Sequence, residues 1–128
     1  MLTQAQAHEF ALDWIDAWNA HDLPRVLAHY SEDFSMRSPY IVEIAGVASG
    51  ELQGKPAVAE YWRKALAKMT ELHFDLLDVL LSVDSMVISY RNHAGRRCAE
   101  VFRFNAQGLV FQAAAHYSID ANDPLKSA

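Results

Sequence analysis

Cysteine is almost absent from this chain. Cys98 is the only one among its 128 residues, so no internal disulfide can form, and a free thiol fits a reducing compartment. No run of Lys or Arg exceeds two residues and the formal charge is -5, so we expect no surface for nucleic-acid phosphates. No apolar stretch approaches the ~20 residues that a membrane helix needs, and no signal peptide is visible. These absences predict a cytoplasmic protein that binds neither nucleic acid nor a membrane.

Several motifs of known chemistry are missing as well. The sequence contains no G-x-G-x-x-G, no P-loop and no G-x-S-x-G, so nucleotide binding and serine-hydrolase chemistry are not expected. His8-Glu9 lacks the second histidine that the zinc-protease helix requires, and a single cysteine cannot build a thiolate zinc site. We therefore expect no metal and no cofactor.

Hydrophobic residues, in contrast, are abundant. They make up 52% of the 128 residues, which is enough for a packed core and far from the composition of a disordered chain. The length fits one domain over residues 1–128, and the polar segment 121–128 is expected to be a flexible tail.

The order of secondary-structure signals indicates helices first and strands afterwards. Apolar residues at helical spacing predict a helix over 3–19, and Asp22 is a suitable N-cap for a second helix over 23–30. An extended segment over 34–44, interrupted by Pro39, precedes a third helix over 56–69. Strands are then predicted over 72–83 with a bulge near Leu76-Leu77, and over 86–92, 97–104 and 109–119. This order is typical of an α+β fold with an antiparallel sheet.

Four short motifs stand in the order and spacing of a known family. W-N-A-H-D-L occupies 18–23, and Y-S-E-D at 30–33 is followed by Ser38-Pro39. G-K at 54–55 precedes A-V and Y-W, and E-V-F-R-F at 100–104 precedes a glycine and His116-Tyr117. Together they resemble the NTF2-like (SnoaL-like) family over almost the whole chain.

That resemblance implies a fold rather than a reaction. It implies an NTF2-like cone, in which three N-terminal helices pack on a curved, mostly antiparallel sheet and enclose a pocket for a small hydrophobic molecule. It also implies a homodimer formed through the sheet. The same fold hosts enzymes, binding proteins and transport adaptors, so the function must be argued from the site.

One relative, ketosteroid isomerase, gives a chemical comparison. That enzyme uses an aspartate base with a tyrosine and a protonated aspartate as oxyanion donors. Aligned on the motifs, the three positions carry Ser38, Trp14 and Glu100 in this chain. Trp14 can donate through its indole N–H, but Ser38 cannot act unaided as a base near neutral pH. We therefore do not expect the ketosteroid isomerase mechanism.

Glu100 is the main catalytic candidate. Alternation along 97–104 places Glu100 on one face with Cys98, Phe102 and Phe104, which should be the concave face of the sheet. An apolar environment raises the pKa of a carboxyl and favours a role in proton transfer. The alternative is a structural carboxylate that is hydrogen-bonded or paired with an arginine.

His116 is the second catalytic candidate, and its position depends on strand register. Alternation places Ala113, Ala115 and Tyr117 on the apolar face of the last strand and His116 on the other, toward a dimer contact. A bulge would reverse the faces and bring His116 to Glu100 as an acid/base pair.

Aromatic and hydroxyl side chains are the candidates for substrate binding, with packing in the core as the alternative for each. These residues are Trp14, Trp18, Ser38, Tyr40, Tyr61, Trp62, Tyr90, Phe102 and Tyr117. The leading hypothesis is a cofactor-free isomerase, cyclase, dehydratase or hydrolase that acts on a small hydrophobic substrate. The alternative is a non-catalytic binding module or a dimeric interaction domain.

Overall fold

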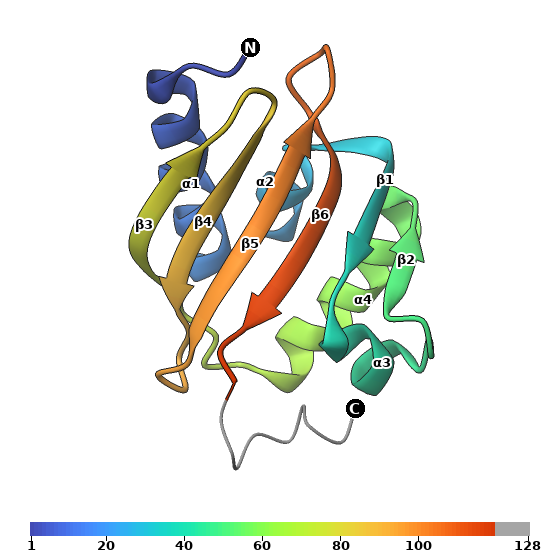
Figure 1. Cartoon of the computed structure of the whole chain (residues 1–128). Helices are drawn as coiled ribbons and strands as arrows, with labels where there is room; N and C mark the ends of the chain where they lie inside the picture. The colour runs from blue at the N-terminus through green and yellow to red at the C-terminus, as the bar shows by residue number, and fades with distance from the viewer. Residues whose placement is uncertain (120–128) are drawn as a thin grey trace.

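The computed structural model describes residues 1–119 and has helices packed against a six-stranded sheet of order β2-β1-β6-β5-β4-β3. In Figure 1, α1, α2 and α4 lie behind the curved sheet. The helices are α1 (Gln4–Asn19), α2 (Leu23–Leu27), α3 (Pro39–Ala45) and α4 (Lys55–Lys68). The strands are β1 (Tyr30–Arg37), β2 (Glu51–Gln53), β3 (Asp75–Leu81), β4 (Ser85–Arg91), β5 (Arg97–Phe104) and β6 (Val110–Tyr117). The predicted α+β architecture is confirmed.

The first helix begins with a capping box. The Thr3 side chain accepts the amide of Gln6 at 3.1 Å, and the Gln6 side chain accepts the amide of Thr3 at 3.0 Å. This reciprocal pair satisfies two amides that the first turn of a helix leaves free. Trp14 and Trp18 follow on the buried face of α1, one turn apart.

The second helix is shorter than predicted. Asp22 caps α2 through the amide of Arg25, at 3.2 Å, but the helix ends at Leu27. Tyr30, which we expected to end this helix, instead begins β1 and pairs with Val110 of β6. Pairing with a strand distant in sequence decides this boundary, so the local pattern could not show it.

The segment over 34–44 was predicted to be extended, and this prediction was wrong for its second half. Ser38 caps a short helix, α3, by accepting the amide of Tyr40 at 3.2 Å, and Pro39 occupies its first turn. Gly46 ends the helix with a left-handed φ of 71°. A serine followed by proline is therefore a helix start here. The short strand β2 was also not predicted.

The sheet is antiparallel except where β1 lies parallel to β6. The bulge predicted on β3 is present, because the register against β4 shifts between Leu76 and Asp78. Along β5, alternate residues are buried, including Cys98, Glu100 and Phe102, as strand alternation predicted. The concave face of the sheet therefore carries the core and the candidate site.

Large side chains fill the space between the helices and the sheet. Phe34, Val58, Ile88 and Phe102 are fully buried, and Trp14 is 1% exposed. No helix within residues 1–119 is long and apolar enough to cross a membrane. The tail expected over 121–128 lies outside the described residues.

Candidate functional site

A cavity of about 150 Å³ opens between the helices and the concave face of the sheet. Residues from α1, β1, α3, α4, β4, β5 and β6 line it, together with the segments that join α4 to β3 and β4 to β5. Aromatic side chains form much of its wall: they are Trp14, Trp18, Tyr40, Tyr61, Trp62, Phe74, Tyr90 and Tyr117. A cavity of this size is on the order of one that admits benzene, so it suits a small ring compound.

Small residues on β6 contribute to the free volume. Ala115 lies opposite Glu100 and Ala113 lies opposite Phe102 in the β5–β6 register. Ala115 lines the cavity directly. A methyl group at this position leaves space above the Glu100 carboxyl that a longer side chain would fill.

Glu100 is the only carboxylate among the described residues that line the cavity. It is 5% exposed, and the Tyr90 hydroxyl donates to its Oε2 at 3.0 Å. Tyr90 on β4 and Glu100 on β5 are diagonal neighbours, because the residue directly opposite Tyr90 on β5 is Cys98. Burial raises the pKa of Glu100 from 4.5 to about 7, and the Tyr90 hydrogen bond opposes this rise. The carboxyl can thus hold or release a proton near neutral pH.

Cys98 lies in the same cavity but is a poor nucleophile. Burial, and then the nearby Glu100 charge, raise the pKa of its thiol from 9.0 to about 11. Its Sγ donates weakly to the carbonyl of Arg96 at 3.6 Å. The thiol is therefore protonated at neutral pH, and only the thiolate is strongly nucleophilic.

Ser38, Tyr61 and Tyr117 form a second polar group in the cavity. Burial raises the pKa of Tyr61 to about 12 and that of Tyr117 well above 10.0, while the nearby Ser38 hydroxyl opposes both rises. Both phenols therefore stay protonated and can donate hydrogen bonds. The carbonyl of Gly50 accepts a hydrogen bond from the Ser38 amide at 3.0 Å and so fixes the backbone at Ser38. A side chain at Gly50 would crowd this contact, because its Cβ would lie 3.3 Å from the Ser38 carbonyl.

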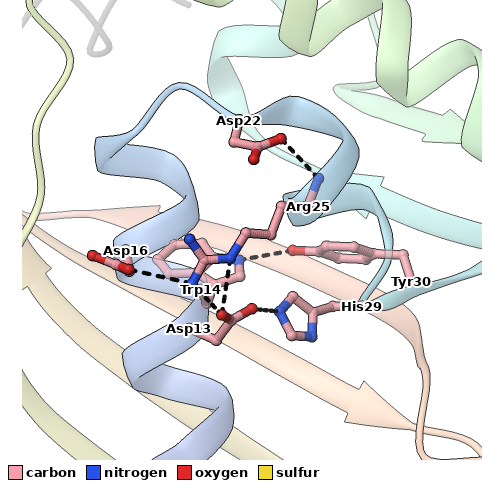
Figure 2. Close-up of polar contacts among 7 residues, drawn as sticks. All are labelled: Asp13, Trp14, Asp16, Asp22, Arg25, His29 and Tyr30. Atoms are coloured by element: carbon pink, nitrogen blue, oxygen red, sulfur yellow. Dashed lines mark hydrogen bonds and ion pairs between the residues drawn. The ribbon is translucent and has the colours of Figure 1, made fainter.

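Trp14 lines the cavity with its ring, but its N–H is already used. The indole Nε1 donates to the hydroxyl of Tyr30 at 3.0 Å, in a buried contact drawn in Figure 2. The expectation that Trp14 can donate this N–H to a substrate is therefore corrected. The sequence could not show this, because Tyr30 was assigned to a helix rather than to β1.

A group of charged side chains lies outside the cavity, around the same helix (Figure 2). Asp13 accepts from Arg25 through Oδ1, and its Oδ2 lies 2.6 Å from His29 Nε2. Arg25 also contacts Asp16 at 3.2 Å. The Arg25 and His29 contacts lower the pKa of Asp13 despite partial burial. This group ties α1 to α2 and to the start of β1, which supports the wall formed by Trp14.

The W-N-A-H-D-L segment holds another part of the wall. The Asn19 side chain accepts the amide of Phe74 at 2.7 Å and donates to its carbonyl at 2.9 Å. His21 Nε2 lies 2.8 Å from the carbonyl of Leu72. Phe74 then stacks on Trp14, with ring centroids 5.6 Å apart, and lies 4.3 Å from the Tyr90 ring. The motif thus fixes the segment that precedes β3.

The structure brings most of the predicted site residues together. Those that line the cavity are Trp14, Trp18, Ser38, Tyr40, Tyr61, Trp62, Tyr90, Glu100 and Tyr117. Phe102 does not line it: this ring is fully buried and packs edge-on against Phe10, at 5.1 Å, and Trp14, at 5.4 Å. The position of Phe102 on the same strand face as Glu100 predicted that its ring is buried. The sequence could not show which residues cover that ring.

His116 lies apart from Glu100. It is exposed on the opposite face of the sheet, where its Nδ1 is 3.2 Å from the carbonyl of Ala114. The register shift in β6 occurs before Gln112, so alternation continues undisturbed through His116. The acid/base pair of Glu100 and His116 is therefore not formed.

Sequence reasoning missed the loops that complete the wall. Leu72 and Phe74 come from the segment before β3, and Asn92, His93 and Ala94 come from the turn between β4 and β5. His93 Nε2 lies 3.6 Å from Glu71 Oε1, so these two loops meet beside the cavity. The sequence held one signal for these loops, the W-N-A-H-D-L motif, because its Asn19 and His21 contact the backbone of Phe74 and Leu72. Within residues 1–119 no group of three or more acidic, histidine or cysteine side chains is placed to hold a metal ion.

Comparisons with known proteins agree with this architecture. A SnoaL-like protein of unknown function from Burkholderia thailandensis is 50% identical, with a TM-score of 0.87 over 93% of this chain and 100% of that one. An NTF2-like protein from Cytophaga hutchinsonii is 15% identical, with a TM-score of 0.68 over 92% of this chain and 95% of that one. The epoxide hydrolase/cyclase-like enzyme SalBIII is 13% identical, with a TM-score of 0.72 over 93% and 95% of the two chains.

A search of curated proteins finds no match. The family model of the SnoaL-like domain matches residues 11–123, which include every described residue that lines the cavity. Together with the 50% identity over 93% of the chain, this match establishes the family. The chain belongs to the SnoaL-like domain family.

Proposed function

We propose that this protein is an enzyme that moves a proton on a small, largely apolar substrate, with Glu100 as its acid/base. The observation that carries the proposal is Glu100, 5% exposed and the single carboxyl among the residues of 1–119 that line a cavity with many aromatic side chains. A pKa of about 7 lets this group accept a proton and return it at neutral pH.

The hydrogen bonding of Glu100 supports this role. The Tyr90 hydroxyl donates a hydrogen bond to Oε2 of Glu100, and Oε1 of Glu100 has no hydrogen-bond partner among residues 1–119. Tyr90 holds the carboxyl in place, because its own pKa is raised well above 10.0 by burial and it keeps its proton. One oxygen is thus positioned and the other is open to a ligand.

The tyrosines on the other wall supply hydrogen-bond donors. Tyr61 and Tyr117 remain neutral at neutral pH and face the same cavity as Glu100. A neutral phenol that donates to a substrate oxygen stabilises negative charge developing there when a neighbouring carbon loses its proton. Ser38, which lies near both hydroxyls, helps to orient them.

The chemistry described for SalBIII, an epoxide hydrolase/cyclase-like enzyme in pyran ring formation, is of the same general kind. Opening an epoxide and closing a ring both require proton transfer to and from oxygen. At 13% identity this likeness concerns the fold and names no reaction for this chain. It supports the proposal only in that this fold can host an enzyme of the acid/base type. Isomerisation, cyclisation, dehydration and hydrolysis all fit a single carboxyl with phenol donors.

The experiment that tests the proposal is a ligand screen followed by product analysis. Wild type and Glu100→Gln are screened by thermal shift against small carbonyl compounds, lactones and terpenoids, and the hits are examined by mass spectrometry. We expect wild type to convert a compound that Glu100→Gln only binds. Glu9→Gln, which changes an exposed carboxylate on α1, is the matched control and should retain turnover.

A non-catalytic binding module is the second candidate, and one observation favours it. The Trp14 N–H donates to the Tyr30 hydroxyl at 3.0 Å, so it is not free to serve a substrate. Compounds that stabilise wild type and Glu100→Gln equally and emerge unchanged would establish this second function in place of the first.

For assembly, we propose a homodimer through the outer face of the sheet. The helices α1, α2 and α4 cover only the inner face (Figure 1), and the outer face carries Val87, Ala99, Val101 and Ala114. Sedimentation should give a dimer for wild type and a monomer for Val101→Arg. A wild-type monomer at micromolar concentration would contradict this assembly.

A further inference from the structure

The cavity is open at one end of the sheet and closed at the other. The turn between β4 and β5 forms the open end, where His93 and Ala94 line the cavity and are exposed. Farther along the sheet, Phe102 on β5 lies directly opposite Ala113 on β6. Both residues are buried on the concave face, and neither lines the cavity. This pair therefore closes the inner end.

Glu100 and Ala115 form the last row of the concave face before that closed end. They lie directly opposite each other on β5 and β6, and strand alternation places them on the same face as Phe102 and Ala113. Both Glu100 and Ala115 line the cavity. Ile88, the residue opposite Glu100 on β4, is fully buried and does not line it. The free space at the inner end therefore lies on the β6 side of Glu100, above Ala115.

The orientation of the Glu100 carboxyl keeps this space open. Its Oε2 accepts the Tyr90 hydroxyl at 3.0 Å, and because Tyr90 lies on β4 the carboxyl is drawn away from β6. Ala115 is only partly buried, whereas Ala113, two residues earlier on the same face, is 5% exposed. The surface that Ala115 retains belongs to the cavity. A molecule that fills the inner end therefore lies against both the Glu100 carboxyl and the Ala115 methyl group.

We propose that Ala115 sets the size of the substrate at the inner end of the cavity and so limits it to a single small ring beside Glu100. This inference rests on the proposed function, because it takes Glu100 as the group that the substrate meets. Residues directly opposite each other on antiparallel strands have Cβ atoms about 4.5–5.5 Å apart, so each further carbon on the Ala115 side chain would occupy space next to the carboxyl. The cavity volume of about 150 Å³ agrees with one ring of the size of benzene.

The test uses cyclopentanone, cyclohexanone and cycloheptanone, a series in which each ring has one methylene group more than the last. Their affinities for wild type, Ala115→Val and Ala115→Gly are measured by calorimetric titration. One buried methylene group changes an affinity by about fourfold. We expect Ala115→Gly to shift the preference toward cycloheptanone by about fourfold relative to wild type. Ala115→Val should shift it toward cyclopentanone by at least about fourfold, because the added methyl groups crowd the larger rings.

Ratios of affinities separate a size limit from a general loss of structure, which would weaken the binding of all three ketones alike. Ala114→Val adds the same methyl groups to the outer face of the same strand, so it is the matched control and should keep the wild-type ratios. Valine favours strands, so the test stands on Ala115→Val even if glycine weakens β6. Wild-type ratios in Ala115→Val would overturn the inference, as would failure of all three ketones to bind wild type up to their solubility limits.

Turnover separates this inference from the proposed function. Glu100→Gln keeps the size of the side chain, so it should show the wild-type preference among the three ketones while it loses conversion of any substrate that the ligand screen finds. Retained conversion in Glu100→Gln, with shifted ratios in Ala115→Val, would reject the acid/base role and leave the size limit. Lost conversion in Glu100→Gln, with wild-type ratios in Ala115→Val, would leave the acid/base role and overturn the size limit.

Discussion

Replacing Glu100 by glutamine tests the burial of its carboxyl without an activity assay. Glutamine keeps the size and polarity of the protonated side chain but cannot ionise. The pKa of Glu100 in the folded protein is about 7, against an ordinary 4.5, because burial disfavours the charged form. The folded protein therefore binds this proton more tightly than the unfolded chain does.

The sign of the effect follows from this difference in proton binding. Between pH 4.5 and about 7 the folded state holds more protons, so wild-type stability falls as the pH rises through that range. A pKa raised from 4.5 to about 7 corresponds to about 3 kcal/mol of lost stability above pH 7. Glu100→Gln lacks this loss, so its stability relative to wild type should increase with pH by about 3 kcal/mol.

The assay is urea denaturation at about pH 5 and about pH 8, with the free energy of unfolding compared between variant and wild type at each pH. Contributions of all other titrating groups cancel in this comparison. Glu9→Gln, on the exposed surface of α1, should show a difference that does not change with pH. A pH-independent difference for Glu100→Gln would refute the claim that folding desolvates this carboxyl.

Three further predictions concern residues around the cavity. Cys98, with a thiol pKa of about 11, should react with Ellman's reagent only slowly until urea unfolds the protein; rapid native labelling would contradict its burial. Asn19→Ala leaves the amide and carbonyl of Phe74 unpaired and should lower the free energy of unfolding by about 2 kcal/mol, measured in urea. Asp13→Asn should lower it by no more than about 1 kcal/mol at neutral pH, because the Asp13 side chain is 35% exposed. Since the pKa of Asp13 is lowered, this deficit should shrink as the pH falls below 3.8, and a deficit constant with pH would exclude the ion pair as its cause.

The fold could be predicted where local signals and tertiary structure agree. The long helices α1 and α4 and the strand β5 have strong periodicity, and their buried faces follow from it. The boundary at Tyr30 and the helix after Pro39 could not be predicted in the same way. Tyr30 is held by a strand distant in sequence, and the Ser38 cap outweighs the extended tendency of the residues before it.

The site could be predicted as a set of residues but not as a set of hydrogen bonds. Strand alternation correctly placed Glu100 on the concave face, and the family motifs pointed to Trp14 and Ser38. Which donor meets which acceptor depends on distances that the sequence does not contain. The Tyr30 contact, for example, occupies the indole N–H of Trp14 and so removes one expected donor.

The position of β6 constrains how the chain can fold during its synthesis. β6 lies between β1 and β5, and Tyr30 pairs with Val110, so β6, the last strand within residues 1–119, joins the two halves of the sheet. While a ribosome is still making the residues before 110, β1 has only the short β2 as a partner and Phe34 has no complete sheet to be buried in. The nascent chain therefore exposes apolar surface until β6 emerges, and cooperative folding waits for that strand.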